Sequence, residues 1–432
     1  MHLIKVLLRY FYYLCATKRN LFQIYIMKKV FLLLAAAACL AVSCKHEEKG
    51  EVLSPEENKA TLDETMTKAV QMLEVDHWQG TADLITGSAT VLQNITPDES
   101  AANWLTEATG AWYSEADGVD IMTIDLEKIQ GTLTVKDNVV SATEGKGLNV
   151  AYSLEDGTAV AANLTVKNSS TKLLLDEDYD YQQIPGGEDY QKVLISKEYL
   201  IVPASVDAVV TADGKQAASV KLTADLKVAN ETPTPNDSFS ATLAVSADKY
   251  TFSLTRAKYS PTEVAVDASI KYDKTTVVAA SFEAKGKIGL DEDQDLDPLA
   301  TTGKVKASFK ILDNVELKGD LNWDEFKSLI GNSDNTEAGA KELAAKAEKC
   351  VNLVLYVQKT AQAKLGFEAY QPAENVWSAQ PVIRFEDGSQ YMLPEEFFNP
   401  NNFPKTVDAV NAALAQMEEF LAGPEPETEP LQ

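Results

Sequence analysis

A strict alternation of apolar and polar residues runs through the middle of the chain, from about Val119 to Leu321. The clearest stretch is Val220–Val228, where the alternation holds at every position. Successive side chains of a strand point to opposite faces of a sheet, so this pattern predicts strands with one apolar face. The same pattern recurs in Phe239–Val245, Val264–Ile270 and Val305–Ile311.

Short turn signals separate these segments. They are Asp213-Gly214, Asp248-Lys249, Ser260-Pro261, Asp273-Lys274 and Asp313-Asn314. Strands joined by such short turns pair as antiparallel neighbours. The sequence therefore predicts a large antiparallel meander, of about ten strands or more.

Helical patterns flank this region. Ser54-Pro55-Glu56-Glu57 has a capping residue, a proline at the first helical position and Glu at the third, which predicts a helix start. Thr96-Pro97-Asp98-Glu99 repeats the signal and predicts a short second helix. One apolar stripe follows the first signal: Leu62, Met66, Ala69, Val70 and Leu73.

The C-terminal part returns to helical spacing. Its pattern predicts a helix over roughly 336–365, a hairpin from Val382 to Leu393 around the turn Glu386–Ser389, and a helix over about 404–421. The expected fold is therefore α+β, with a large antiparallel meander, sandwich-like or half-barrel-like, packed by flanking amphipathic helices.

The expected ectodomain spans 54–423. A possible subdomain boundary lies near 170–190, where Asp176–Tyr181 and Pro185-Gly186-Gly187 are expected to interrupt the strands. The acidic, proline-rich tail 424–432 is expected to be disordered.

The N-terminus reads as a secretion signal. Residues 1–43 carry six bases and no acid, and Met27-Lys28-Lys29 precedes an apolar run from Val30 to Leu40. This charge pattern is typical of a signal peptide, here 27–43, and the run is shorter than the roughly 20 residues of a membrane span. Residues 1–26 are interpreted as upstream read-through, with translation starting at Met27.

Ala41-Val42-Ser43-Cys44 resembles the lipobox of bacterial lipoproteins. In that family the cysteine after the cleavage site is acylated on its thiol and its new amino group, and Cys44 is the matching position. Several acyl chains anchor a protein stably to a membrane. The alternative is ordinary cleavage that leaves Cys44 as a free thiol.

Residues 44–53 form the expected tether. Lys45-His46-Glu47-Glu48-Lys49 resembles the charged export signal of Bacteroidota-type surface lipoproteins, although His46 separates Lys45 from the first acid. The resemblance implies an outer-membrane lipoprotein displayed on the cell surface. The alternative is a simple solvated tether on a protein that faces the periplasm.

The net charge of the chain limits the classes of partner that it can bind. The 432 residues contain 39 Lys and Arg against 65 Asp and Glu, a net charge of −26. Without residues 1–43, 33 bases remain against 65 acids, a net charge of −32. Nucleic-acid binding requires a basic face and is therefore not expected.

Few residues suit nucleophilic or metal chemistry. After removal of the signal peptide the histidines are His46, in the tether, and His77, which is interpreted as a helix-end residue. Cys350 is expected to be buried as a small apolar residue. No catalytic residue is assigned.

The acidic runs are the candidates for a bound ion. Asp291, Asp293 and Asp295 alternate along one loop, and Asp176, Asp178 and Asp180 repeat this spacing. Calcium prefers such oxygen-rich loops, but both runs lack the glycine and the final Glu of an EF-hand. Calcium at Asp291–Asp295 is therefore a weak hypothesis against a solvated acidic loop, and no other cofactor is expected.

The expected function is a non-enzymatic ligand-binding or interaction module on the cell envelope. Its ligand is left open between a small molecule, a glycan and an envelope protein. The alternatives are a carboxylate-dependent glycan hydrolase and a purely structural envelope protein. A sugar-stacking platform is weighed against burial for five aromatic residues: Trp104, Trp112, Tyr113, Trp323 and Trp377.

Overall fold

The computed structural model describes residues 51–422, except for 74–78, 111, 184–189, 290–296, 298–299, 330–335, 394–395 and 397–398. The described ranges contain nineteen strands and six α-helices, a β-rich α+β fold. The chain divides into two compact units. Unit 1 comprises Met1–Trp78, Ala265–Gly289 and Asp297–Gln432, and unit 2 comprises Gln79–Val264 and Leu290–Leu296.

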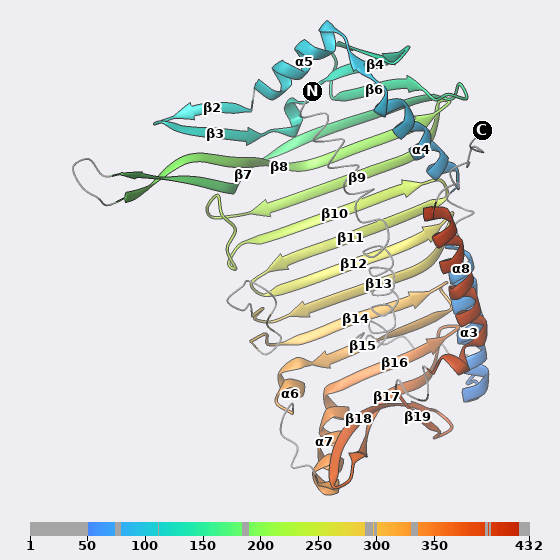
Figure 1. Cartoon of the computed structure of the whole chain (residues 1–432). Helices are drawn as coiled ribbons and strands as arrows, with labels where there is room; N and C mark the ends of the chain where they lie inside the picture. Colours follow the sequence, from blue (N-terminus) through green and yellow to red (C-terminus); the bar gives the residue numbers. More distant parts are fainter. Residues whose placement is uncertain are drawn as a thin grey trace, which may run out of the picture. The chain divides into compact units, whose positions relative to one another are not determined.

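Unit 2 contains two helices and eleven strands, drawn in blue to green in Figure 1. The helices are α4 (Gln79–Gln93) and α5 (Glu99–Gly110). The strands are β1 (Thr96–Pro97), β2 (Tyr113–Ala116), β3 (Val119–Ile124), β4 (Gly131–Lys136), β5 (Val139–Thr143), β6 (Leu148–Ser153), β7 (Ala159–Gln183), β8 (Tyr190–Ala212), β9 (Lys215–Lys227), β10 (Ser238–Ala247) and β11 (Tyr250–Ser260). Strand β12 (Glu263–Tyr272) crosses the division between the units.

Strands β6 to β11 of unit 2 pair in chain order as antiparallel neighbours, as the short turns predict. The sheet is nevertheless mixed, because β1–β5, β3–β8 and β4–β6 are parallel pairs. Strand β4 pairs with β5 on one edge and β6 on the other, so the chain crosses over after β5. The turn signals predicted the hairpins, but such crossovers have no short-turn signal.

Unit 1 contains a meander of seven strands, paired in chain order as antiparallel neighbours. They are β13 (Thr275–Lys285), β14 (Lys304–Ile311), β15 (Val315–Asn322), β16 (Val351–Val357), β17 (Thr360–Ala373), β18 (Val376–Phe385) and β19 (Gln390–Met392). Its helices are α3 (Pro55–Gln71), α6 (Trp323–Lys327), α7 (Glu337–Cys350) and α8 (Pro404–Ala422).

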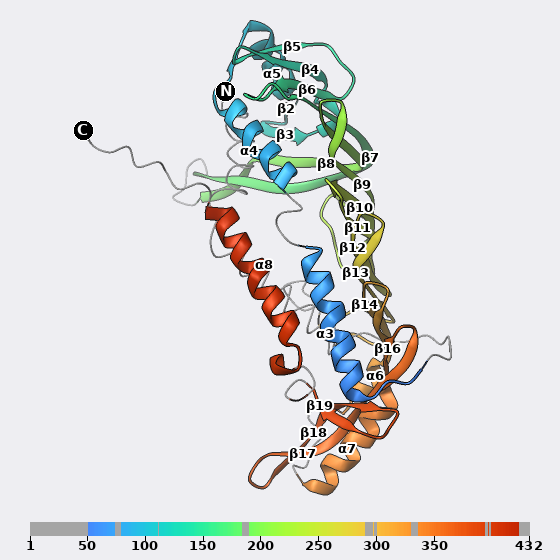
Figure 2. The same ribbon diagram turned by 90° about the vertical axis from the view of Figure 1, so that its right-hand side faces the viewer.

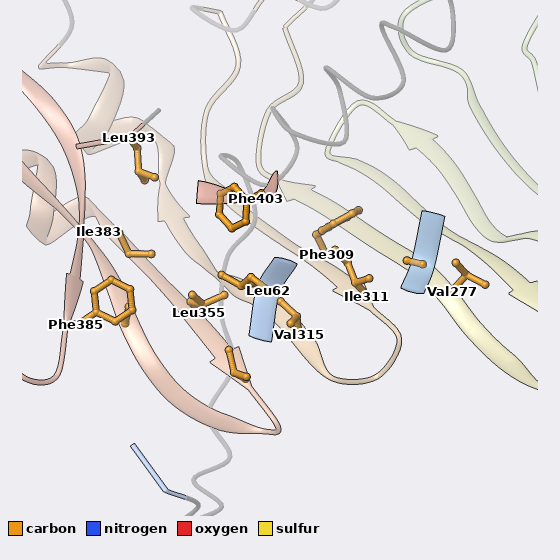
Figure 3. Packing of buried hydrophobic residues seen from close by; sticks show 13 residues of the cluster. Leu62, Val277, Phe309, Ile311, Val315, Leu355, Ile383, Phe385, Leu393 and Phe403 are labelled. Atoms are coloured by element: carbon orange, nitrogen blue, oxygen red, sulfur yellow. The ribbon is translucent and has the colours of Figure 1, made fainter. Parts of the chain in front are cut away.

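Helices cover both faces of the unit 1 sheet at β17 and β18. Leu62 and Ala69 of α3 join a buried cluster with Ile383 and Phe385 of β18 (Figure 3). Arg384 lies between these two strand residues and points to the opposite face. There its guanidinium binds both carboxylate oxygens of Glu348 in α7, at 2.6 and 2.7 Å. Unit 1 therefore has three layers at this position, with α7 on one side and α3 on the other.

Helix α8 lies beside α3 (Figure 2) and is fastened to it by a buried carboxylate. Asp63 of α3 is 5% exposed and accepts hydrogen bonds from the backbone N–H groups of Lys405 and Thr406, at 3.3 and 2.8 Å. These N–H groups belong to the first turn of α8, which has no partner within its own helix. A side chain of one helix therefore caps the next.

The predicted start of α3 is confirmed in detail. The Ser54 hydroxyl accepts from the Glu57 N–H, and the Glu57 carboxylate accepts from the Ser54 N–H. The predicted start of α5 is displaced by two residues, because Thr96 and Pro97 form β1 and Asp98 accepts from the Ala101 N–H at 2.9 Å.

The predicted helix over 336–365 is wrong beyond Cys350. Helix α7 ends there, and the chain continues as β16 and β17. Val351–Val357 is rich in β-branched residues, which favour strands. Gln358 and Lys359 then adopt φ of 52° and 67°, which makes the tight turn into β17.

One further sequence interpretation needs correction, and one helix was not predicted. Asp176–Tyr181 do not interrupt the strands, since β7 continues through them to Gln183. Helix α4 carries no start signal in the sequence and contains Gly80 and Gly87, which disfavour helix. The hairpin at 382–393 and the last helix are confirmed as β18–β19 and α8.

Candidate binding surface

The alternating pattern of strands β8 to β11 places apolar side chains on one side of the unit 2 sheet. Cross-strand neighbours share a face, and the register pairs Leu222 with Leu243 and Leu226 with Phe239. We call this side the apolar face. It is formed by Val206, Ala208 and Val210 of β8, Val220, Leu222, Ala224 and Leu226 of β9, Phe239, Ala241, Leu243 and Val245 of β10, and Phe252, Leu254, Ala257 and Tyr259 of β11.

The apolar face is not a buried core. Within the described strands β9 and β10 no side chain is buried. Phe239 and Phe252 are 43% and 39% exposed, whereas Phe385 in the unit 1 cluster is 5% exposed. A contiguous apolar surface that stays exposed is typical of an interaction site.

Aromatic rings concentrate on β10 and β11. Phe239 lies opposite Tyr259, and the two rings stack with centroids 6.2 Å apart and planes 16° from parallel. Phe252 lies opposite Val245, further along the same pair of strands. Aromatic side chains offer large contact areas with few rotatable bonds, which favours them at interfaces.

Helix α4 covers one end of the apolar face. The Tyr152 hydroxyl donates to the Ser88 hydroxyl of α4 at 2.7 Å, and Tyr152 lies opposite Val160 on the apolar side of β6 and β7. The other end of α4 reaches the β10–β11 turn, where the Thr81 hydroxyl donates to Asp248 at 2.6 Å. Figure 1 shows α4 along the ends of the strands.

The opposite side of the same strands is polar. Thr223 and Thr242 share a hydrogen bond of 2.7 Å between their hydroxyls, as do Ser219 and Ser246. Lys221 of this side lies 3.6 Å from Asp207. The hydroxyl and charged groups named here are paired with one another across the strands. This side of the sheet therefore differs in its chemistry from the apolar face.

Several predicted site residues lie outside the described part of the chain. These are the lipidation residue Cys44, the two histidines His46 and His77, and the calcium candidates Asp291, Asp293 and Asp295. The second acidic run lies in β7, where Asp178 accepts from the Ser196 hydroxyl at 3.2 Å. Over the described residues, no three His, Cys, Asp or Glu side chains group as metal ligands would.

Cys350 is buried at the end of α7, as predicted. Its thiol donates to the Lys346 carbonyl at 3.3 Å. Burial, together with the nearby Glu325 carboxylate, raises the pKa of the thiol. A thiol with a raised pKa is a poor nucleophile, so Cys350 serves packing.

Three of the candidate aromatic residues, Trp104, Trp112 and Trp323, have structural contacts. Trp112 is 8% exposed, and the Trp104 indole donates to the Gln130 carbonyl at 2.6 Å. Trp323 packs against Phe326 within α6, with centroids 6.1 Å apart. These three tryptophans give no support to a shared sugar-stacking platform. The phenylalanines of the apolar face were not among the candidate site residues taken from the sequence, where Phe239 appeared only in a strand pattern.

A small cavity of about 330 Å³ lies in unit 1 beside α3. Its lining is mostly polar: Thr61, Glu64, Thr65, Lys68, Leu312, Asn314 and Gln358. Ligand pockets are mostly apolar with a few convergent polar groups. This lining therefore does not match the apolar cavity that a lipid carrier needs.

Comparison with known proteins gives no relative. No protein-family model, no curated protein and no solved structure matches the chain. Among the described helices, none is long and apolar enough to cross a membrane.

Proposed function

We propose that the protein is a lipid-anchored lipoprotein of the outer membrane, displayed on the cell surface, that binds an envelope protein through the apolar face. The observation that carries this proposal is the exposure of the face, where Phe239 and Phe252 on neighbouring strands of a regular sheet are 43% and 39% exposed. The anchor is proposed from the lipobox at Cys44.

A protein partner fits this surface better than a small molecule. The apolar face is the side of a regular sheet, and strands alone do not enclose a ligand as a pocket does. Protein interfaces, in contrast, are broad and enriched in aromatic residues. The described cavity is polar and lies in unit 1, so it supports neither a lipid carrier nor an aromatic-lined hydrolase cleft.

Changing Cys44 to serine is expected to abolish lipid attachment. Serine lacks the thiol that the first acyl transfer requires. Cells fed an alkyne-bearing fatty acid should label the native protein in the membrane fraction, and C44S should lose the label. The control is Cys39→Ser, five residues upstream within the apolar run, which should keep the label. A native protein without label would contradict the anchor.

A photoreactive benzoyl-phenylalanine at Phe239 should form an adduct with an envelope protein when intact cells are irradiated. The matched control carries the same group at Thr242, which lies three residues away on the polar side of β10. Phe239→Asp, combined with the photoreactive group at Phe252, should weaken capture about tenfold or more, since interface aromatics often contribute over 1.4 kcal/mol.

The mass of the adduct decides the outcome. A defined adduct from Phe239 and none from Thr242 supports the proposal. Equal capture from both positions, or none from either, contradicts it. An adduct of twice the chain mass would identify a second copy as the occupant and overturn the proposed envelope partner.

A further inference from the structure

The ends of β7 and β8 project as a two-stranded arm, drawn in green in Figure 1. We define the arm as residues 176–183 of β7 and 190–198 of β8. The two strands pair as antiparallel neighbours from Asp176 opposite Glu198 to Gln183 opposite Tyr190. Strand β3 pairs with β8 only from Ser196 onward, so the outer half of the arm lies beyond this neighbour.

Three tyrosines lie on one side of the arm. The register places Tyr179 opposite Leu194, Tyr181 opposite Lys192 and Gln183 opposite Tyr190, and these alternate residues share a face. Tyr179, Tyr181 and Tyr190 are 39%, 66% and 63% exposed. Tyrosine combines a large apolar ring with a hydroxyl, and exposed groups of tyrosines are typical of protein-binding surfaces.

Two lysine ammonium groups of the arm contact its own tyrosine ring and carboxylate. Lys192 Nζ lies 3.7 Å from the centroid of the Tyr179 ring. Lys197 Nζ lies 2.8 Å from Glu177, whose other oxygen accepts from the Tyr179 hydroxyl at 2.7 Å. The Lys197 ammonium lowers the pKa of Glu177, with the Tyr179 hydroxyl as the second cause. Rings and carboxylates of this arm thus form the two contacts that a cation prefers.

Further groups of the same kind remain exposed. Tyr181 and Tyr190 are the two most exposed tyrosines of the arm, and Asp176, Asp178 and Asp180 are exposed on its strands. The acids add to a chain whose net charge is −26. This charge disfavours a second copy as the occupant and favours a partner of opposite charge.

We propose that the arm binds a cationic segment of a protein, through cation–π contacts of lysine or arginine with Tyr181 and Tyr190 on one face of the arm. Asp176, Asp178 and Asp180 alternate with the tyrosines and lie on the opposite face, where they add to the negative charge that attracts such a segment. The site is distinct from the apolar face and does not depend on it. The binding free energy of this site comes from charge and ring contacts, whereas that of the apolar face comes from the burial of apolar surface.

Fluorescence anisotropy with two ten-residue probes tests this inference on the mature full chain in detergent. One probe alternates Arg with Gly and the other alternates Glu with Gly. The chain should bind the Arg probe, and binding should weaken at high salt because exposed charges are screened. The double variant Y181A/Y190A should bind about tenfold more weakly, as the loss of two cation–π contacts predicts.

The controls separate a defined site from general attraction to an acidic protein. Tyr113 of β2 is 65% exposed, so Tyr113→Ala removes an equally exposed tyrosine outside the arm and should leave binding unchanged. Asp225→Asn, on the polar side of β9 and outside the arm, should also leave binding unchanged. Circular dichroism checks that each variant is folded.

Three outcomes would overturn the inference: equal binding of both probes, unchanged binding by Y181A/Y190A, or equal loss with Tyr113→Ala. A loss confined to the arm variants supports it. Phe239→Asp should leave the Arg probe unaffected, so failure of the apolar-face proposal and failure of this one are distinguishable.

Discussion

Replacing Phe385 with alanine is expected to lower the free energy of unfolding of unit 1 by about 3–5 kcal/mol, the usual cost of truncating a buried phenylalanine. Phe385 is 5% exposed and meets the Tyr391 ring edge to face, with centroids 5.9 Å apart. Phe252→Ala in the apolar face should cost less, about 2–3 kcal/mol, because a residue that is 39% exposed has about a third less burial to lose than Phe385.

Hydrogen exchange followed by mass spectrometry can measure the two losses separately. Peptides from β16 to β18 report on unit 1, and peptides from β9 to β11 report on unit 2. The comparison matters because both residues are phenylalanines on strands and differ mainly in what covers them. If Phe252→Ala were as costly as Phe385→Ala, the apolar face would be a folding core, and the basis for a binding surface would disappear.

The strands of the meander could be predicted because alternation and turns are local signals. Asp213, Asp248 and Asp273 adopt φ of 49°, 49° and 57° at the predicted turns, where few other residue types tolerate a positive φ. The pattern at Val220–Val228 predicts which side of β9 is apolar, and the register confirms it.

The covering of each face could not be predicted. Strands of both units carry apolar residues in alternation, but α3 covers the strands around Phe385 whereas Phe239 and Phe252 of the apolar face stay exposed. Local alternation cannot tell a covered face from an exposed one, because the difference depends on distant helices. The helix–strand change at Cys350 was missed for a related reason: apolar residues at 351, 354 and 361 fit a helical stripe as well as they fit strands.

Replacing Gln362 with alanine is expected to destabilise unit 1 by about 2–4 kcal/mol, because it opens a cavity and removes the hydrogen-bond partners of two backbone groups. Gln362 of β17 is 1% exposed. Its side chain accepts from the Leu53 N–H at 2.8 Å and donates to the Glu51 carbonyl at 3.0 Å. Asn58, which is 0% exposed, donates to the Leu53 carbonyl at 3.1 Å.

These bonds join the first described residues to a strand more than three hundred positions later. The seven Cα–Cα steps from Cys44 to Glu51 reach at most about 25 Å when fully extended, so the proposed anchor is tied closely to unit 1. The Leu53 amide should therefore exchange slowly in the native protein and much faster in Q362A, while Gln358→Ala, in the exposed β16–β17 turn, should change neither stability nor exchange.

The exchange rate of the Leu53 amide decides whether residues 51–54 belong to the flexible tether or to unit 1. Fast exchange of the Leu53 amide in the native protein would mean that residues 51–54 move with a flexible tether and that Gln362 is needed only for packing within the sheet. Slow exchange that is lost in Q362A would mean that β17 holds the last residues of the tether. Any force on the proposed lipid anchor would then be shared between α3, through the chain itself, and β17, through two hydrogen bonds of one glutamine.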